Sequence, residues 1–83
     1  MTEEEIKSKI DSIIKDVLDL DEIDLYAPYM QLIDDLGADS LDAVDILIRL
    51  ETEFDISVPQ EDIDINCTVQ NIYDYIISKV NYD

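Results

Sequence analysis

The sequence predicts an all-α fold: a small four-helix bundle with three main helices, one short helix and a long loop after the first helix. Its 83 residues suffice for one domain, residues 1–83. Hydrophobic residues make up 47% of the chain, which is too many for a disordered acidic segment. One glycine and two prolines leave little material for the turns of a β-sandwich, whereas apolar residues recur at helical spacing.

The first predicted helix runs from Glu3 to Leu18. Thr2 and Glu5 form a capping box, in which the Thr2 hydroxyl accepts a hydrogen bond from the amide of residue 5. Apolar residues then recur every three or four positions and form one stripe: Ile6, Ile10, Ile13, Ile14 and Val17.

A long loop is predicted from Asp19 to Asp35. Periodicity fades there, and Pro28 disfavours helical geometry at the residue before it. Loops of this length are uncommon and are often functional. Three aspartates in it lack the glycine and glutamate of a calcium-binding loop, so no metal site is predicted: Asp19, Asp21 and Asp24.

The second helix is predicted to begin after Asp39, its N-cap, and to carry two apolar faces. The larger face is the expected core face: Ala43, Ile46, Leu47, Leu50 and Phe54. A second apolar stripe lies nearly opposite: Leu41, Val44 and Ile48. This second stripe must be covered by the long loop, by another helix or by a partner.

A short helical turn is predicted from Pro59 to about Ile63, and Thr68 is expected to cap the last helix. That helix repeats apolar residues at helical spacing: Val69, Ile72, Tyr73, Ile76 and Val80. The single cysteine, Cys67, cannot form an internal disulfide and is expected to pack as a small hydrophobic residue.

Charge excludes several classes of function. With 22 acidic and 5 basic side chains, the net charge of −17 repels nucleic-acid phosphates and anionic lipid, so partners with basic patches are expected. No apolar run approaches the roughly 20 residues of a membrane span, and the acidic start is unlike a signal peptide. We therefore expect a cytoplasmic protein with no nucleic-acid partner and no membrane insertion.

Ser40 is the candidate functional residue. It stands at the start of the second helix, where unpaired amides and the helix dipole favour a bound or attached anion. The chain contains no histidine to activate the hydroxyl, so no catalytic residue is predicted. These signals indicate a serine modified by another enzyme, and an ordinary helix-start serine is the alternative that they leave open.

Residues 34–42, Asp-Asp-Leu-Gly-Ala-Asp-Ser-Leu-Asp, resemble the attachment-site signature of acyl carrier proteins. The resemblance continues through residues 50–56, Val58-Pro59 and Thr68-Val69, and so covers essentially the full chain in order. It implies an acyl-carrier-type domain of the type II kind, with a covalent 4′-phosphopantetheine on Ser40. A phosphopantetheinyl transferase (holo-synthase) that uses Mg²⁺ would transfer this group from coenzyme A, and the group would carry acyl intermediates as thioesters.

The resemblance also implies a docking face along the second helix. Its negative charges would be Asp39, Asp42, Asp45 and Glu51, and its apolar residues would be Leu41, Val44 and Ile48. The implied partners are acyl-transferring and condensing enzymes of fatty acid biosynthesis that have basic docking patches. The carrier itself is expected to be a monomer. Arg49 departs from the family pattern and is expected to pair with Asp45, four positions before it, and with the nearby Asp42.

Two alternatives remain open. One is a specialised carrier for polyketide, aminoacyl or other dedicated cargo. Arg49 keeps this alternative open, as does the loop before the second helix, which is about one residue longer than the family resemblance implies and has Leu32 where members usually carry phenylalanine. The other is a non-carrying interaction module of the same fold.

Overall fold

The computed structural model describes residues 2–20, 27–59 and 66–80. Within these ranges the chain forms three helices: α1 (Glu3–Leu18), α2 (Ser40–Phe54) and α3 (Val69–Val80). The same ranges hold no strand, only an isolated antiparallel bridge between Gln31 and Thr68. The predicted all-α fold is confirmed, whereas the predicted short helix after Pro59 lies almost wholly on residues 60–65, outside the described residues.

The predicted ends of α1 are confirmed. The Thr2 hydroxyl accepts from the amide of Glu5 at 3.2 Å, which satisfies one of the unpaired donors of the first turn. The Glu5 carboxylate accepts from the Thr2 hydroxyl and not from the Thr2 amide, so only the hydroxyl half of the predicted capping box is present. Asp19 ends the helix in the left-handed conformation, with φ of 55°.

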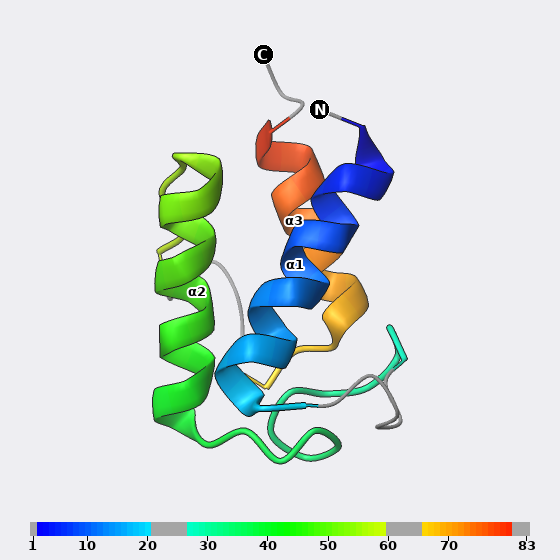
Figure 1. The fold of residues 1–83 in the computed structure, drawn as a ribbon, viewed down its shortest axis with the longest axis vertical. Helices are drawn as coiled ribbons and strands as arrows, with labels where there is room; N and C mark the ends of the chain where they lie inside the picture. Colours follow the sequence, from blue (N-terminus) through cyan, green and yellow to red (C-terminus); the bar gives the residue numbers. More distant parts are fainter. Residues whose placement is uncertain (1, 21–26, 60–65, 81–83) are drawn as a thin grey trace.

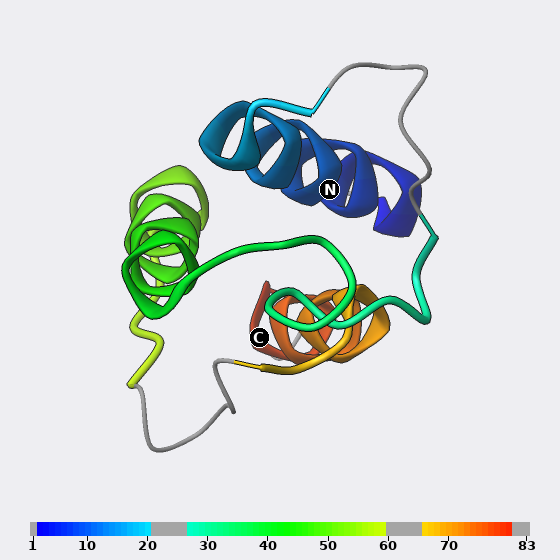
Figure 2. The same ribbon diagram turned by 90° about the horizontal axis from the view of Figure 1, so that it is seen from below.

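The three helices surround one apolar core (Figures 1 and 2). α1 runs antiparallel to α2 and α3 and packs against both (Figure 1). The predicted core stripes are confirmed. Their fully buried side chains include Ile6, Ile10, Ile14, Ile46, Leu50, Ile72 and Ile76. Each such side chain contributes ~1.5–3 kcal/mol on burial. Tyr73 and Cys67 are also buried, as the sequence predicts.

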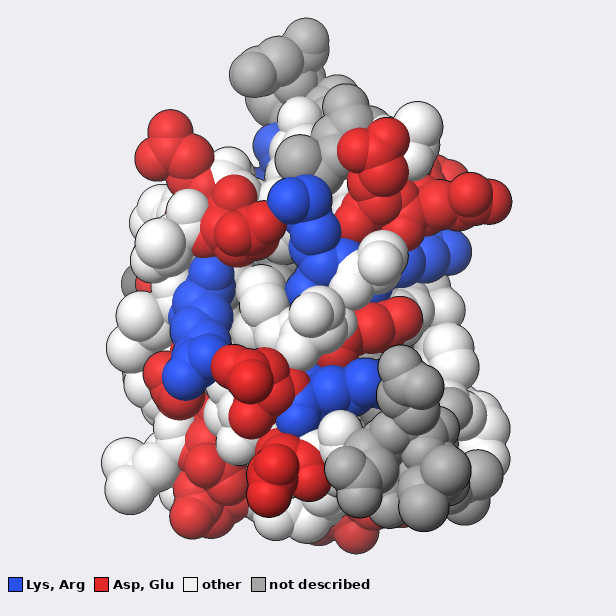
Figure 3. Space-filling view, in the orientation of Figure 1, with Lys and Arg blue, Asp and Glu red and all other residues white. Residues whose placement is uncertain are grey.

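Three polar contacts fasten α1 to its neighbours. The Lys9 ammonium lies 2.7 Å from the Glu53 carboxylate of α2, and the Tyr73 hydroxyl of α3 donates to the Asp11 carboxylate. Arg49 of α2 reaches the Asp16 carboxylate of α1 at 2.7 Å. Figure 3 shows this face of the molecule, where the few Lys and Arg side chains lie among acidic ones. Two of the five basic side chains are therefore used between α1 and α2.

The chain before α2 is fastened to the start of α3. The amides of Val69 and Gln70 donate to the carbonyls of Met30 and Pro28 at 3.0 and 2.8 Å. In return, the Leu32 amide donates to the Cys67 carbonyl at 3.0 Å. Figure 2 shows this segment crossing beside α3 before it turns into α2. The predicted long loop is thus hydrogen-bonded over residues 28–34 to the start of α3 and the residues just before it.

Candidate functional site

The start of α2 is a complete capping box. The Asp39 carboxylate accepts from the Asp42 amide at 2.8 Å, and the Asp42 carboxylate accepts from the Asp39 amide at 3.3 Å. Asp39 is therefore the N-cap, as predicted, and the first turn is held from both sides. Two carboxylates next to the positive end of the helix dipole are favourably placed.

Ser40 is the first residue of α2, and its side chain is exposed (lower end of α2 in Figure 1). Among the described residues, none accepts a hydrogen bond from the amide of Ser40 or Leu41, because the Asp39 side chain takes only the amide of Asp42. These two donors and the dipole can serve an anion bonded to the Ser40 oxygen. The expected placement of Ser40 at a helix start is confirmed.

Gly37 provides the turn that delivers the chain to Ser40. Its φ is +79°, which glycine adopts without the steric cost that a Cβ would bring. Ala38 follows and is buried, with its amide donating to the Leu32 carbonyl at 2.9 Å. The turn therefore directs Ala38 into the core and leaves Asp39 and Ser40 at the surface.

Within the described ranges, no side chain is hydrogen-bonded to the Ser40 hydroxyl. The sequence contains no histidine, and its basic side chains number only five. Two of these, Lys9 and Arg49, are paired with carboxylates elsewhere in the bundle. A serine without a general base is a poor nucleophile at neutral pH. The arrangement suits a hydroxyl that an external enzyme activates.

The second apolar stripe of α2 is uncovered in the described structure. Leu41 is 80% exposed and Ile48 is 54% exposed, while Val44 is partly buried. Large apolar side chains at such exposure next to one another are typical of a surface that another protein covers. Since Leu41 directly follows Ser40, the stripe begins at the candidate attachment residue.

The four predicted docking carboxylates have different surroundings. Asp39 and Asp42 cap the helix, and Asp45 lies 3.4 Å from the Arg49 guanidinium. The Glu51 carboxylate accepts from the Val58 amide at 3.2 Å and so holds the turn after α2.

Arg49 pairs as predicted with Asp45, but its shorter contact is with Asp16 of α1. The structure records no pair between Arg49 and Asp42. Helical spacing could not reveal Asp16, because the two residues lie 33 positions apart. Negative charge on α2 is therefore least compensated near Ser40 and is partly neutralised further along the helix.

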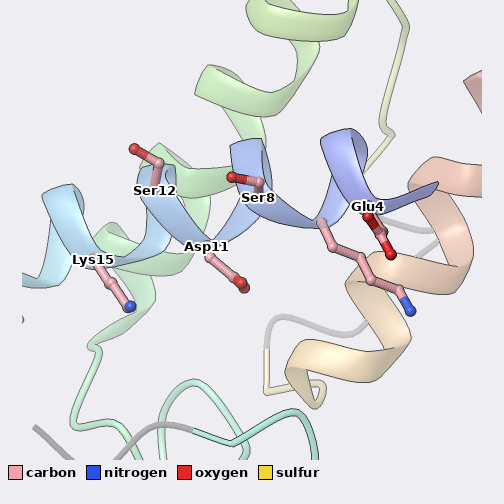
Figure 4. Close-up of a pocket in the computed structure, with 6 residues that line it drawn as sticks. Glu4, Ser8, Asp11, Ser12 and Lys15 are labelled. Carbon is pink, nitrogen blue, oxygen red and sulfur yellow. The ribbon is translucent and has the colours of Figure 1, made fainter. Parts of the chain in front are cut away.

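A shallow depression of about 480 Å³ lies elsewhere, along the outer side of α1 (Figure 4). Its lining mixes both signs of charge: Glu4, Lys7, Ser8, Asp11, Ser12 and Lys15. Asp11 and Lys15 point to one side of the helix in Figure 4, and Asp11 already accepts from Tyr73. None of the predicted site residues contributes to this depression.

Within the described ranges, no group of three or more acidic, thiol or imidazole side chains could hold a metal ion. No helix of the described structure has the length and apolar character needed to cross a bilayer. Asp21 and Asp24 lie outside the described residues.

Asn66 is a residue of this region that the sequence does not single out. Its side-chain oxygen accepts from the amides of Ile33 and Asp34, and its side-chain nitrogen donates to the Asp34 carboxylate. No local pattern could have indicated this role, because the partners lie more than 30 positions away, as the separations of 32 and 33 show.

Comparisons with known proteins agree with this geometry. The family described as "Phosphopantetheine attachment site" matches residues 8–76. The acyl carrier protein of Chlorobium phaeovibrioides is 46% identical over 79 residues, covering 95% of this chain and all of the relative. That of Thermotoga maritima is 46% identical over 77 residues, covering 93% of this chain and 94% of the relative. Because the matched region covers Ser40, all of α2 and most of α1 and α3, this chain belongs to the acyl carrier protein family, whose members bear a phosphopantetheine attachment site.

Proposed function

We propose that the Ser40 oxygen is the atom to which 4′-phosphopantetheine is attached. In this step a phosphopantetheinyl transferase forms a bond between the Ser40 oxygen and the phosphorus of the pantetheine phosphate. The pyrophosphate bond of coenzyme A breaks, 3′,5′-ADP leaves, and the serine proton passes to a base of the transferase. The observation that carries the proposal is an exposed hydroxyl on the first residue of a capped helix.

The residues around Ser40 fit such a group. A phosphodiester there would meet the two amides of the first turn, Ser40 and Leu41, for which no described residue is an acceptor. The chain turns at Gly37, which has a positive φ, and Ala38 is buried. The preceding segment is therefore directed toward the core and does not cover the Ser40 hydroxyl. When bound, the group supplies a terminal thiol that holds acyl groups as thioesters.

The chain is a carrier and not an enzyme. It carries acyl groups on phosphopantetheine for fatty acid synthesis, as its family membership and its acyl carrier relatives support. Its own residues hold the attachment site in place and present it to enzymes, among them a phosphopantetheinyl transferase and fatty acid enzymes. The absence of a membrane-spanning helix in the described residues is compatible with the cytoplasmic location that we propose.

We further propose that partners dock along α2. Over the roughly 18 Å from residue 39 to residue 51, exposed or partly exposed apolar side chains alternate with carboxylates: Asp39, Leu41, Asp42, Val44, Asp45, Ile48 and Glu51. Opposite charge on the partner would speed encounter, and burial of Leu41 and Ile48 would lengthen the lifetime of the complex. Since Arg49 neutralises Asp45, the strongest attraction is expected at the Ser40 end.

The test is the intact mass after incubation with coenzyme A, Mg²⁺ and a broad-specificity phosphopantetheinyl transferase. The wild-type chain is expected to gain the mass of one phosphopantetheine, and Ser40→Ala is expected to gain nothing. Ser12→Ala is the matched control, because Ser12 is an equally exposed helical serine on α1. No gain in the wild type, or an equal gain in Ser40→Ala, would contradict the attachment site.

Cargo is tested on the holo form. Elongation by fatty acid synthesis enzymes is expected, whereas loading only by a ligase for polyketide or aminoacyl cargo would indicate a specialised pathway.

A further inference from the structure

Asn66 makes a concentrated set of contacts with the segment that precedes the attachment site. Its side-chain oxygen accepts from the amides of Ile33 and Asp34 at 3.2 and 3.3 Å. Its side-chain nitrogen donates to the Asp34 carboxylate at 3.0 Å, and its carbonyl accepts from the Gln31 side chain at 3.4 Å. One residue outside the helices is therefore hydrogen-bonded to three residues of the segment that leads to Ser40: Gln31, Ile33 and Asp34.

The contacts continue from this segment to Ser40. Residues 31–36 form successive turns in which the amides of Asp35 and Leu36 donate to the Gln31 carbonyl at 3.1 and 3.0 Å. The Ala38 amide closes the turn on the Leu32 carbonyl at 2.9 Å, and both of these side chains are buried. From Ala38 only the N-cap separates the turn from Ser40. The orientation of the turn therefore limits where the start of α2 can lie relative to α3.

We infer that Asn66 is a positioning residue for the loading of Ser40, an inference that rests on the proposed function. It fixes the turn of residues 31–38 against the start of α3, and this turn sets the entry of the chain into α2 (Figure 2). Its recorded hydrogen bonds go to Gln31, Ile33 and Asp34, and none of these is a docking residue of α2. Its effect is expected on the rate of the transfer step rather than on docking.

The side-chain chemistry explains why an amide is required. The Asn66 side chain accepts from two backbone amides with its oxygen and donates to the exposed Asp34 carboxylate with its nitrogen, and an amide supplies both functions. A carboxylate at position 66 would still accept from the amides but would repel Asp34. Exchanging the two side chains, with Asn66→Asp and Asp34→Asn together, restores one donor and one acceptor at the same net charge. This exchange is the matched rescue variant.

The experiment measures the kinetics of phosphopantetheine transfer from coenzyme A to the full chain by a broad-specificity transferase. Asn66→Asp is expected to lower kcat by about tenfold, the change produced when a competent turn is populated about one tenth of the time. KM is expected to stay within about twofold, because the docking stripe keeps its residues. The exchanged double variant is expected to recover wild-type kcat.

One control and one second test variant separate positioning from loss of stability. Tyr73→Phe removes the hydrogen bond to Asp11, away from the turn, and is expected to lower the Tm without lowering kcat. Asp34→Ala changes an exposed side chain and leaves the fold intact, so it is the second variant should Asn66→Asp not fold. It deletes one contact of Asn66 and is expected to lower kcat by about threefold.

The outcomes are decisive. A wild-type chain that gains no mass would refute the proposed function itself. A loaded wild type with unchanged kcat in Asn66→Asp or Asp34→Ala would overturn the role of Asn66 alone. Failure of the exchanged variant to recover, or an equal fall of kcat in Tyr73→Phe, would also overturn it. A fall in Asn66→Asp with recovery in the exchanged variant would support it.

Discussion

Replacing Leu41 by glutamine tests whether the apolar stripe of α2 is a docking surface. Leu41 is 80% exposed, so the substitution removes little contact within the bundle. We expect the free energy of unfolding to change by less than about 0.5 kcal/mol, the range typical of surface substitutions. Any large loss of function would then come from contacts with a partner.

The expected loss of affinity follows from the exposed fractions. Full burial of a leucine or isoleucine side chain contributes ~1.5–3 kcal/mol. Covering the 80% of Leu41 that is exposed therefore contributes about 1.2–2.4 kcal/mol, or about 8- to 60-fold in Kd. For Ile48, exposed by 54%, the corresponding values are about 0.8–1.6 kcal/mol and about 4- to 15-fold.

The assay is calorimetric titration of the holo protein against a condensing enzyme of fatty acid synthesis, with the melting temperature of each variant measured alongside. Leu41→Gln is expected to weaken binding more than Ile48→Gln. Tyr29→Gln is the control, because Tyr29 is 72% exposed but lies on the loop before α2. An unchanged Kd in Leu41→Gln, or an equal loss in Tyr29→Gln, would refute the docking surface.

Four further predictions concern the bundle and its charges. Gly37→Ala should lower the free energy of unfolding by about 1 kcal/mol in a urea titration, because a residue with a Cβ is strained at a φ of +79°. The loss should stay small because the added Cβ meets nothing within 4 Å. Asp55→Asn should raise it by about 0.3–1 kcal/mol, because the helix loses a negative charge at its C-terminus and asparagine tolerates the φ of 53°. Arg49→Gln should speed association with basic partners at low salt in stopped-flow measurements and have little effect at high salt. The pKa of Lys9 is raised above its ordinary value, mainly by the hydrogen bond to Glu53 and secondly by the negative charge of Glu53. The Lys9–Glu53 pair contributes its full stability below the ordinary pKa of lysine, and this contribution is lost as the pH rises through the raised pKa. Unfolding titrations of Lys9→Met should not show this alkaline loss.

Each of these has a clear contrary result. A cost well above about 2 kcal/mol for Gly37→Ala would mean a steric clash that the open space around it does not predict. A lower stability in Asp55→Asn would argue against repulsion at the helix end. Equal acceleration at low and high salt in Arg49→Gln would argue against long-range attraction. An identical alkaline loss in Lys9→Met would show that other groups cause it.

Much of the fold is readable from local chemistry. The bounds of α1 and the caps at Thr2 and Asp39 depend on residues three positions apart, and all were confirmed. Thr68 caps α3 in the same way, with the Asn71 amide donating to its hydroxyl at 3.1 Å. The two faces of α2 follow from helical periodicity, and the burial of the larger face was confirmed. Such features are predictable because their partners lie within one helical turn. Whether the loop, another helix or a partner covers the second stripe was left open by the sequence, and the structure leaves Leu41 and Ile48 exposed.

The sequence alone determined the helix ends, the core stripes, the existence of a second apolar stripe on α2 and the candidacy of Ser40. That this stripe is left uncovered was decided by the tertiary structure. Only the tertiary structure decided how Asn66 holds the turn before Ser40, and that Arg49 reaches Asp16 as well as Asp45. The physical reason is range: capping and periodicity depend on neighbours fixed by the geometry of one helix. Contacts across 32 or 33 positions exist only after the core has fixed where the helices and the loop lie relative to one another.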